Sequence, residues 1–256
     1  YIRKILPEKY FIKTNPFDTR SLVTDVMSFI NTNGIWFDGI GTFSVNAVPT
    51  TSVLTEMLGL KGISPGIAFR SSNFKLSMRE FCRLGKIDMP HFVFVDTLTE
   101  RTLKKAISQI GGPAVIKPVS GYSSASVYKI DGKEKLSDII RNIKTSYKLN
   151  KDGILKNSNN KYLVESYIEG IQISVDGIIA DNKIQFAGIV ETEVSSPPNF
   201  TAYANYFPPR ISGTQYNASL KYCKKILQSL EFNNCAFHCE LKLNRNKPFL
   251  IEIACR

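Results

Sequence analysis

The protein has 256 residues, of which 43% are hydrophobic and 21% charged. This composition is typical of a globular protein with a real core and excludes a mainly disordered chain. No stretch of about 18 consecutive apolar residues predicts a transmembrane helix, and the first residues lack the apolar segment of a signal peptide. The formal net charge is +11, spread along the chain, which favours a solvated basic surface or a cleft for a phosphorylated ligand over a nucleic-acid groove.

Five cysteines, an odd number, are scattered along the chain without zinc-site spacing. A disulfide framework favours an even set, so a reducing compartment, the cytoplasm, is expected.

The spacing of apolar residues predicts helices and strands along the whole chain. Helices are predicted over residues 21–31, 49–58, 77–84, 100–109, 136–143 and 214–230. Strands are predicted over residues 35–37, 91–95, 114–118, 127–130, 162–165, 172–179, 183–191, 237–243 and 248–253. The early alternation of helix and strand favours a parallel sheet with helices on its faces.

The connections carry their own signals. Asp181 and Asn182 predict a tight hairpin turn, residues 150–160 a polar surface loop, and residues 197–209 a long aromatic loop. The first helix has no strand before it, and the chain stops at Arg256 directly after an apolar strand whose edge would expose unpaired backbone groups. We therefore expect further segments beyond both ends.

A lysine at the end of a predicted buried strand precedes a loop of small residues. Lys117 and Pro118 end this strand, and Ser and Gly dominate residues 120–126. Small residues let backbone N–H groups approach phosphate oxygens, and a nearby lysine adds positive charge. The segment fits a phosphate site, while a hairpin with a surface lysine explains it equally well.

Two glutamates lie on the predicted final hairpin. The strand period of two places His238, Glu240 and Lys242 on one face, and Glu252 lies between two isoleucines. A carboxylate in such a strand is costly to bury unless a partner neutralises it. Glu240 and Glu252 converging on phosphate oxygens suit Mg²⁺; the alternative is that Glu252 pairs with an Arg or Lys.

A third segment, residues 163–170, is a strand that runs into an extended connector. Backbone groups of such a connector could hydrogen-bond an adenine, with apolar neighbours on its faces.

In their order and spacing these segments resemble the ATP-grasp superfamily, and within it the carboxylate–amine ligases that join amino acids or make related amides. The resemblance rests on residues 36–39, 59–65, 75–79, 117–118, 165–170 and 252–256. It implies an α/β (α+β) protein with an ATP-grasp fold of two α+β lobes. The lobes would be residues 77–163 and 164–256, the second continuing beyond the chain, preceded by the remainder of a Rossmann-like domain at 1–76.

The resemblance also implies roles for individual residues. Lys75 and Lys117 match the lysines that hold nucleotide phosphates, and Glu165 matches the acid at the adenine pocket. Gln172 stands where the family usually has a ribose-binding Glu. The loop that closes over the phosphates would contribute Ser120, Gly121, Tyr122, Ser123, Ser124 and Ser126. The connector that contacts the purine would contribute Ser166, Tyr167 and Ile168, with backbone groups of Ser166 and Ile168 at its edge.

Glu240 and Glu252 match the magnesium-binding acids, where Mn²⁺ can substitute. Arg256 matches the arginine that contacts the reacting carboxylate or transferred phosphoryl, so Arg256 and Lys117 are the expected catalytic residues. Ala254 stands where many members have a third metal ligand, Asn, and Ala125 replaces a loop Gly. The first departure leaves two-metal geometry open.

The implied reaction is ADP-forming amide or peptide synthesis through an acylphosphate, with ATP and Mg²⁺ as cofactors and amino acids as the carboxylate and amine. No nucleic-acid or membrane partner is expected, and a homodimer is the family default. Alternatives are another ATP-grasp reaction (biotin-carboxylase-like or D-Ala–D-Ala ligase-like), a non-catalytic ATP-binding module, or a basic nucleic-acid-binding protein. His238 is a hydrogen-bonded strand residue or a ligand contact, and residues 200–207 are core packing or part of an acceptor pocket.

Overall fold

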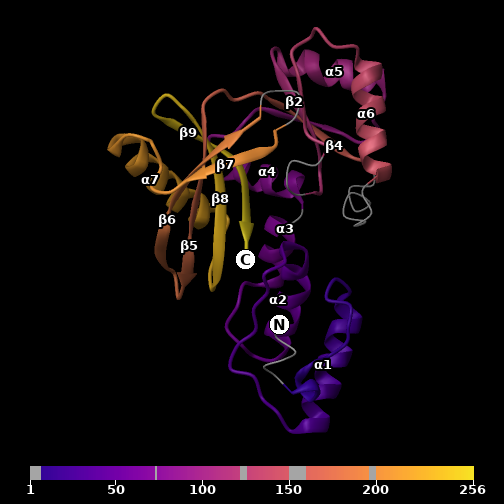
Figure 1. The fold of residues 1–256 in the computed structure, drawn as a ribbon, viewed down its shortest axis with the longest axis vertical. Helices are drawn as coiled ribbons and strands as arrows, with labels where there is room; N and C mark the ends of the chain where they lie inside the picture. The colour runs from indigo at the N-terminus through magenta and orange to yellow at the C-terminus, as the bar shows by residue number, and fades with distance from the viewer. Residues whose placement is uncertain (1–6, 73, 122–125, 150–159, 196–199) are drawn as a thin grey trace.

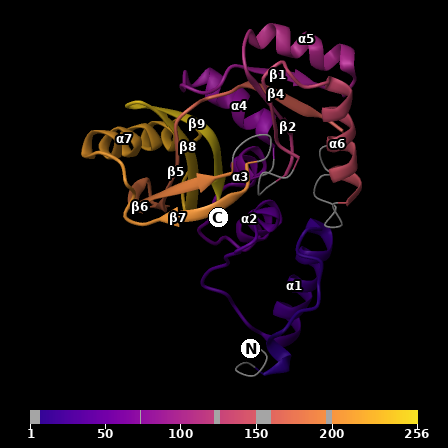
Figure 2. The ribbon, with the colours of Figure 1, turned by 45° about the horizontal axis from the view of Figure 1, so that its top comes forward.

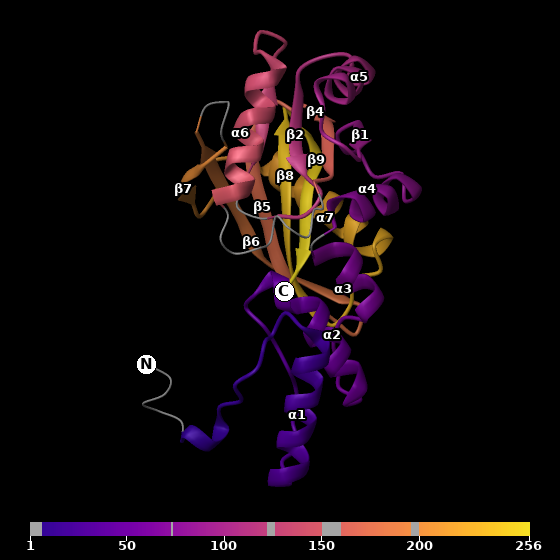
Figure 3. The ribbon, with the colours of Figure 1, turned by 90° about the vertical axis from the view of Figure 1, so that its right-hand side faces the viewer.

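The computed structural model describes residues 7–72, 74–121, 126–149, 160–195 and 200–256. The predicted 150–160 loop lies almost wholly outside these residues. The N-terminal part is helical and extends below two sheets (Figures 1 and 3). Its elements are η2 (Glu8–Tyr10), α1 (Thr19–Asn33), η3 (Val45–Ala47), α2 (Val48–Met57) and α3 (Pro65–Ser72), followed by α4 (Lys75–Leu84).

The ends of α1 follow from the local sequence. Asp18 caps its first turn by accepting a hydrogen bond from the Ser21 backbone N–H. Gly34 ends the helix in the left-handed conformation at φ 62°, where its N–H donates to the Ile30 carbonyl. Glycine adopts this conformation without a Cβ clash. The helix predicted over residues 21–31 is confirmed.

The strand predicted at 35–37 is wrong. Residues 7–72, all described, contain no strand, and Trp36, in the middle of this apolar run, is 83% exposed. A short apolar run becomes a strand only where a neighbouring strand can pair with its backbone, and this region offers none. The expected Rossmann-like remainder is therefore not confirmed, and α3 was missed.

A four-stranded sheet forms the first lobe. Its strands are β1 (Phe92–Val95), β2 (Ala114–Pro118), β3 (Tyr128–Ile130) and β4 (Tyr162–Ser166), in the order β1-β4-β2-β3. The helices α5 (Glu100–Ile110) and α6 (Leu136–Leu149) cover its outer face (Figure 3). Leu103, Ile116 and Ile143 are fully buried between these layers.

A five-stranded sheet forms the second lobe. Its strands are β5 (Ile171–Ala180), β6 (Lys183–Val194), β7 (Ala202–Tyr206), β8 (Cys235–Asn244) and β9 (Lys247–Cys255), in the order β7-β6-β5-β8-β9. The helix α7 (Gly213–Ser229) packs on its outer side, and the four-stranded sheet with α5 and α6 lies on the opposite side (Figure 2). The tight turn at Asp181 and Asn182 is confirmed, with φ angles of 48° and 61°.

Two predictions about the sheets are wrong. Every strand pair among the described residues is antiparallel, so the described part of the chain does not contain the parallel sheet expected from the early helix–strand alternation. The loop predicted at 197–209 contains β7, which pairs with β6. The reason is that β6 would otherwise leave a long edge of unpaired backbone groups; residues 196–199 lie outside the described part.

Alternation along β5, β8 and β9 separates two surfaces of the second sheet. Val175, Cys239 and Ile253 are fully buried in the core that also contains Ile226 of α7 and Cys82 of α4. Their sequence neighbours, polar except for Ala254, line the cleft on the other side. Register pairs Ser174 with Glu240 and Glu240 with Glu252, and pairs Asp176 with His238 and His238 with Ala254. A row of polar side chains therefore faces the first lobe.

Within the described part of the chain, no helix is both long enough and apolar enough to cross a membrane.

Candidate active site

A cleft of about 1580 Å³ lies between the two sheets. It gathers predicted site residues from α4, β2, β4, β5, β8 and β9, and its lining includes Lys75, Lys117, Gly121, Glu165, Ser166, Tyr167, Ile168, Gln172, Glu240, Glu252 and Arg256. Residues separated by up to about two thirds of the chain thus share one cavity.

The structure describes only part of the predicted phosphate loop, residues 120–126. Ser120 is fully buried, and its Oγ has no hydrogen-bond partner among the residues that the structure describes. Ser126 bonds to Ser146 at 2.9 Å, and neither serine lines the cleft. Tyr122, Ser123, Ser124 and Ala125 lie outside the described residues, so their predicted role stays a prediction.

A buried triad of charges joins the lobes. Lys117 Nζ lies 2.8 Å from Glu165 Oε2. Arg79 of α4, fully buried, donates from Nε and Nη2 to the two oxygens of Glu165 at 2.8 and 3.0 Å. Arg79 also donates to the backbone carbonyls of Leu250 and Ile251 in β9 at 2.9 and 2.8 Å. One guanidinium therefore fixes β4 of the first lobe to β9 of the second.

The electrostatics of this triad follow from burial and pairing. Burial opposes ionisation of Glu165, but Arg79 and then Lys117 outweigh it and lower the pKa of Glu165 to about 2. Burial, followed by the charges of Arg79 and Lys75, lowers the pKa of Lys117 to about 8 although Glu165 opposes the shift. Both oxygens of Glu165 are engaged, so this residue orients Lys117 in the structure. Sequence reasoning assigned Arg79 no role; four polar contacts of a fully buried arginine identify it.

Lys75 lies at the start of α4, beside the second acid. Its Nζ donates to the Gly121 carbonyl at 2.6 Å and pairs with Glu252 Oε1 at 3.1 Å. Only 8% of Lys75 is exposed. Glu252 therefore does have the lysine partner that the alternative required, and that partner is the expected phosphate-binding residue.

Glu240 and Glu252 lie directly opposite each other on β8 and β9. Like charges at such a pair repel unless cations offset them. Burial opposes ionisation of Glu240, but the hydrogen bond and charge of His238, then the charges of Lys75 and Lys117, lower its pKa. The side chain of Glu240 is 34% exposed and that of Glu252 is 30% exposed. The carboxylate oxygens of both residues can therefore contact a ligand in the cleft.

The donor set fits a hard cation that takes a few carboxylates and completes its coordination with ligand oxygens. No group of three or more His, Cys, Asp or Glu that could hold a metal occurs among the residues that the structure describes. Ala254 also lines the cleft and has no donor side chain. Among the described residues, Glu240 and Glu252 are the side chains that could hold such a cation, with ligand oxygens completing its coordination.

His238 and Asp176 form a polar relay next to Glu240. His238 Nδ1 lies 2.7 Å from Asp176 Oδ1, and Nε2 lies 3.3 Å from Glu240 Oε1. Ser174 Oγ donates to the other Asp176 oxygen at 2.9 Å. Burial alone would lower the pKa of His238, but the two carboxylates raise it to about 9. His238 is thus the hydrogen-bonded strand histidine of the sequence hypothesis, and Asp176 is a cleft residue that the sequence reasoning missed.

Part of the backbone that was expected to contact a purine is already hydrogen-bonded to neighbouring residues of the first sheet. The backbone N–H of Ser166 donates to the His91 carbonyl at 2.8 Å, and that of Tyr167 donates to the Pro113 carbonyl at 2.9 Å. The N–H groups of Ser166 and Tyr167 are therefore not free for a base, and the expected purine contact of this connector stays a prediction. Ile168 lines the cleft as expected.

The β6–β7 side forms another wall. Phe200 and Phe207 line the cleft together with the hydrogen-bonded pair Thr192 and Asn205. Phe207 is 71% exposed and Tyr203 67%. Core packing is therefore wrong for these two aromatic residues. Phe207 lines the cleft and keeps the hypothesis of a substrate pocket, whereas Tyr203 is not among the lining residues. Arg256 lines the cleft at the end of β9, and its backbone N–H donates to the Ala236 carbonyl.

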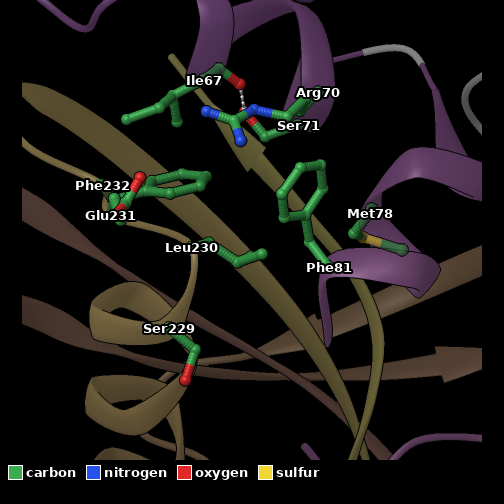
Figure 4. Close-up of a pocket in the computed structure, with 9 residues that line it drawn as sticks. All are labelled: Ile67, Arg70, Ser71, Met78, Phe81, Ser229, Leu230, Glu231 and Phe232. Atoms are coloured by element: carbon green, nitrogen blue, oxygen red, sulfur yellow. Dashed lines mark hydrogen bonds between the residues drawn. The ribbon is translucent and has the colours of Figure 1, made fainter. Parts of the chain in front are cut away.

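A second cavity, of about 250 Å³, lies between α3, α4 and the end of α7 (Figure 4). The Arg70 guanidinium lies over the Phe81 ring at 4.3 Å from its centroid. None of the residues predicted from the sequence to form the site lines this cavity.

The fold and cleft define an α+β protein with two antiparallel sheets facing each other across a site of paired lysines and carboxylates. Residues 110–256 match the ATP-grasp domain family. The chain belongs to the ATP-grasp family.

The sequence identity to individual curated relatives is low. The chain is 25% identical over 235 residues to alanine–anticapsin ligase of Bacillus subtilis (strain 168), covering 84% of this chain and 49% of that protein. The chain thus spans about half the length of this curated relative.

Among solved structures, an L-amino acid ligase from Bacillus licheniformis matches with a TM-score of 0.71 at 20% identity over 93% of this chain and 53% of that one. A biotin carboxylase from Campylobacter jejuni matches with a TM-score of 0.70 at 14% identity over 91% and 52%. At these identities the structural matches establish the fold alone.

Proposed function

We propose that the protein is an ATP-dependent carboxylate–amine ligase that forms an amide or peptide bond through an acylphosphate and releases ADP. The observation that carries the proposal is the convergence of Lys75, Lys117, Glu240 and Glu252 in one cleft. The names of its relatives, alanine–anticapsin ligase and L-amino acid ligase, support amino acids as the substrate class.

In the first step, a substrate carboxylate oxygen attacks the γ-phosphorus of ATP, and the bond from that phosphorus to the β–γ bridging oxygen breaks. ADP leaves, and the phosphoryl group stays on the substrate. Lys117, oriented by Glu165, and Lys75 would bind the phosphates and offset their charge. Arg256 would bind the reacting carboxylate or the phosphoryl group. Little covalent work falls to the protein, because positioning and charge stabilisation lower the barrier.

In the second step, the amine nitrogen attacks the acyl carbon, inorganic phosphate leaves and the nitrogen loses a proton. The β6–β7 wall would bind one of the two substrates. A closed cleft would exclude water, which would otherwise hydrolyse the acylphosphate.

Glu240 and Glu252 would hold a magnesium ion, or manganese in its place, together with phosphate oxygens. When bound, the ion would neutralise phosphate charge and act as a Lewis acid. Lys75 bonds to one oxygen of Glu252, Oε1, and so lies beside the proposed cation site.

The test is ADP release by the purified protein with ATP and Mg²⁺, screened against pairs of amino acids. Release that requires both a carboxylate and an amine is expected, and Glu252→Gln should abolish it. Release that needs bicarbonate and no amine would favour a carboxylase, and ATP binding without turnover would favour a binding module. Unchanged release by Glu252→Gln would remove this residue from the cation site.

The remaining assignments are proposals of the same kind. We expect a cytoplasmic protein acting on small molecules, without a nucleic-acid or membrane partner, and a homodimer. Salt-sensitive micromolar binding to random oligonucleotides would contradict the expectation that the protein has no nucleic-acid partner.

A further inference from the structure

The cavity between α3, α4 and the end of α7 combines apolar walls with two opposite charges (Figure 4). Among the described residues, none lines both this cavity and the cleft. In Figure 4 the rings of Phe81 and Phe232 lie on two sides of the space, with the Arg70 guanidinium at one end. The other apolar side chains of the wall are Ile67, Met78 and Leu230. The cavity is therefore separate from the proposed active site and has its own chemistry.

Arg70 supplies the positive charge. Its side chain is half-buried. Nε donates to the Gly66 carbonyl of the same helix at 2.9 Å, and the guanidinium lies over the Phe81 ring. No carboxylate pairs with Arg70 in the part of the chain that the structure describes. A guanidinium has five N–H donors, so donors remain for a ligand carboxylate, which can accept two parallel bonds from an arginine.

Glu231 supplies the negative charge, from the chain that follows α7. Its φ is 58°, and its backbone N–H donates to the Gln228 carbonyl at 3.2 Å. This turn places Glu231 between Leu230 and Phe232 on the cavity wall. Glu231 and Arg70 line the same cavity without pairing with each other, and Glu231 has no cationic partner among the described residues. A ligand with both a carboxylate and an ammonium would pair with both side chains, whereas Glu231 would repel a polyphosphate.

The volume limits the size of that ligand. A cavity of about 150 Å³ lined by Leu, Ile and Phe holds a benzene molecule. The 250 Å³ available here leaves room for an apolar group of that size together with one carboxylate and one ammonium. Pockets for larger, drug-sized ligands have about 300–1,000 Å³. The cavity therefore suits a single amino acid.

The cavity lies directly behind the cleft. Ser71 of its wall has its Oγ 3.3 Å from the Sγ of Cys255 in β9, and Cys255 precedes the cleft residue Arg256. Met78 of the wall is in α4, the helix whose first residue, Lys75, lines the cleft. A ligand bound in the cavity would thus leave the cleft open for its own ligands.

We propose that this cavity is a second ligand site, which binds one apolar α-amino acid such as leucine. The carboxylate binds to Arg70, the ammonium to Glu231, and the side chain packs between Phe81 and Phe232. The assignment does not depend on the function proposed for the cleft, because it uses none of the cleft residues.

The experiment is crosslinking of the purified protein with photo-leucine, a leucine analogue with a diazirine in its side chain, mapped by mass spectrometry. Saturable labelling of Phe81 or of residues 229–232 is expected, and excess leucine should suppress it. Saturating ATP and Mg²⁺ should leave this labelling unchanged, because the two cavities are separate. Labelling confined to segments that line the cleft, or the lack of any saturable labelling, would overturn the inference.

The same labelling measures affinity at this site in variants, so an amino acid bound in the cleft does not contribute. Arg70→Met should raise the half-saturating concentration of photo-leucine about tenfold or more, the effect of losing a charge-assisted hydrogen bond. Arg70→Lys should keep most of the affinity, and Arg101→Met, at an exposed position of α5, should change nothing. Equal half-saturation in wild type and Arg70→Met would overturn the inference.

Glu231 is tested with a second competitor, 4-methylpentanoate, which has the leucine side chain and carboxylate but no amine. Glu231→Gln should weaken competition by leucine about two- to fivefold, the range of an exposed ion pair. It should leave competition by 4-methylpentanoate unchanged. Equal weakening of both competitors would contradict the ammonium contact and overturn the amino-acid assignment.

The wild-type labelling is decisive by itself, whatever the stability of the variants. ADP release that depends on amino acids, by a protein whose cavity takes no label, would overturn this inference and leave the proposed function standing. Labelling of the cavity in a protein that releases no ADP would support this inference and contradict the proposed function.

Discussion

The two surfaces of the five-stranded sheet use the same strands for different purposes. The outer surface is apolar and packs on α7, α3 and α4 with fully buried residues such as Val175 and Ile253. The cleft surface carries Ser174, Asp176 and Glu252, all polar, one residue away along the same strands. A shift of one residue along a strand thus separates a group that stabilises the fold from one that can bind a ligand.

Replacing Arg79 should reduce stability most, because this side chain bonds to β4 of the first lobe and to β9 of the second. Arg79→Met would leave Glu165 with Lys117 alone and two β9 carbonyls without their donor. We expect the free energy of unfolding to fall by about 3–5 kcal/mol, the cost of breaking a buried ion pair, measured by urea denaturation. Arg83→Met, exposed on the same helix, should change it by less than about 0.5 kcal/mol. Equal effects would mean that the triad does not hold the lobes together.

Ile253 and Glu252 form a matched pair of neighbours on opposite surfaces. Ile253→Ala should cost about 2–5 kcal/mol of unfolding free energy, because it opens a cavity in the core. Glu252→Gln should cost less than about 1 kcal/mol, because the amide oxygen still accepts from Lys75. Manganese binding followed by electron paramagnetic resonance with an ATP analogue should show the reverse order. The division between the surfaces would fail if Ile253→Ala weakened manganese binding more than Glu252→Gln.

Lys117 is buried like a core residue but lines the cleft, so it tests whether a buried residue can affect ligand binding more than stability. Lys117→Met would remove the proposed phosphate contact, while Arg79 keeps both oxygens of Glu165 paired. ATP affinity should fall by about 10- to 100-fold, equivalent to roughly 1.5–3 kcal/mol, in a calorimetric titration. The unfolding temperature should stay close to wild type, and Lys104→Met, at an exposed position of α5, serves as control. Unchanged ATP affinity would contradict the phosphate role.

The smallest effect is the pH dependence of the Asp176–His238–Glu240 relay. The folded pKa of His238 is raised from 6.5 to about 9, so its stabilisation is fully present below pH 6.5 and is lost as pH rises through 9. After allowance for partial exposure, about 1–2 kcal/mol should disappear between pH 6.5 and pH 9.5.

His238→Gln should remove this slope in urea denaturation at the two pH values, without metal or nucleotide. The lowered pKa values of Asp176 and Glu240 act in the opposite direction, because their contribution is lost only in acid. The same slope in wild type and variant would show that other groups produce it.

Local patterns determined much of the fold. Helical spacing with caps, as in α1, and strand alternation, as around Glu240 and Glu252, depend on residues close in sequence, and these elements formed as predicted. The order and spacing of the segments around Lys75, Lys117, Glu165 and Glu252 also predicted membership of the ATP-grasp family, which the match of residues 110–256 confirms.

Tertiary structure decided what depends on partners far apart in the chain. Residues 35–37 had the pattern of a strand but no neighbour to pair with, whereas 202–206 became a strand because β6 offered an edge. The contacts of Arg79 with Glu165 and β9 span roughly 85 to 170 residues, so no local pattern reveals them. Whether a buried lysine meets a carboxylate, as Lys117 does, or a backbone carbonyl, as Lys242 does, is likewise fixed only when the lobes assemble.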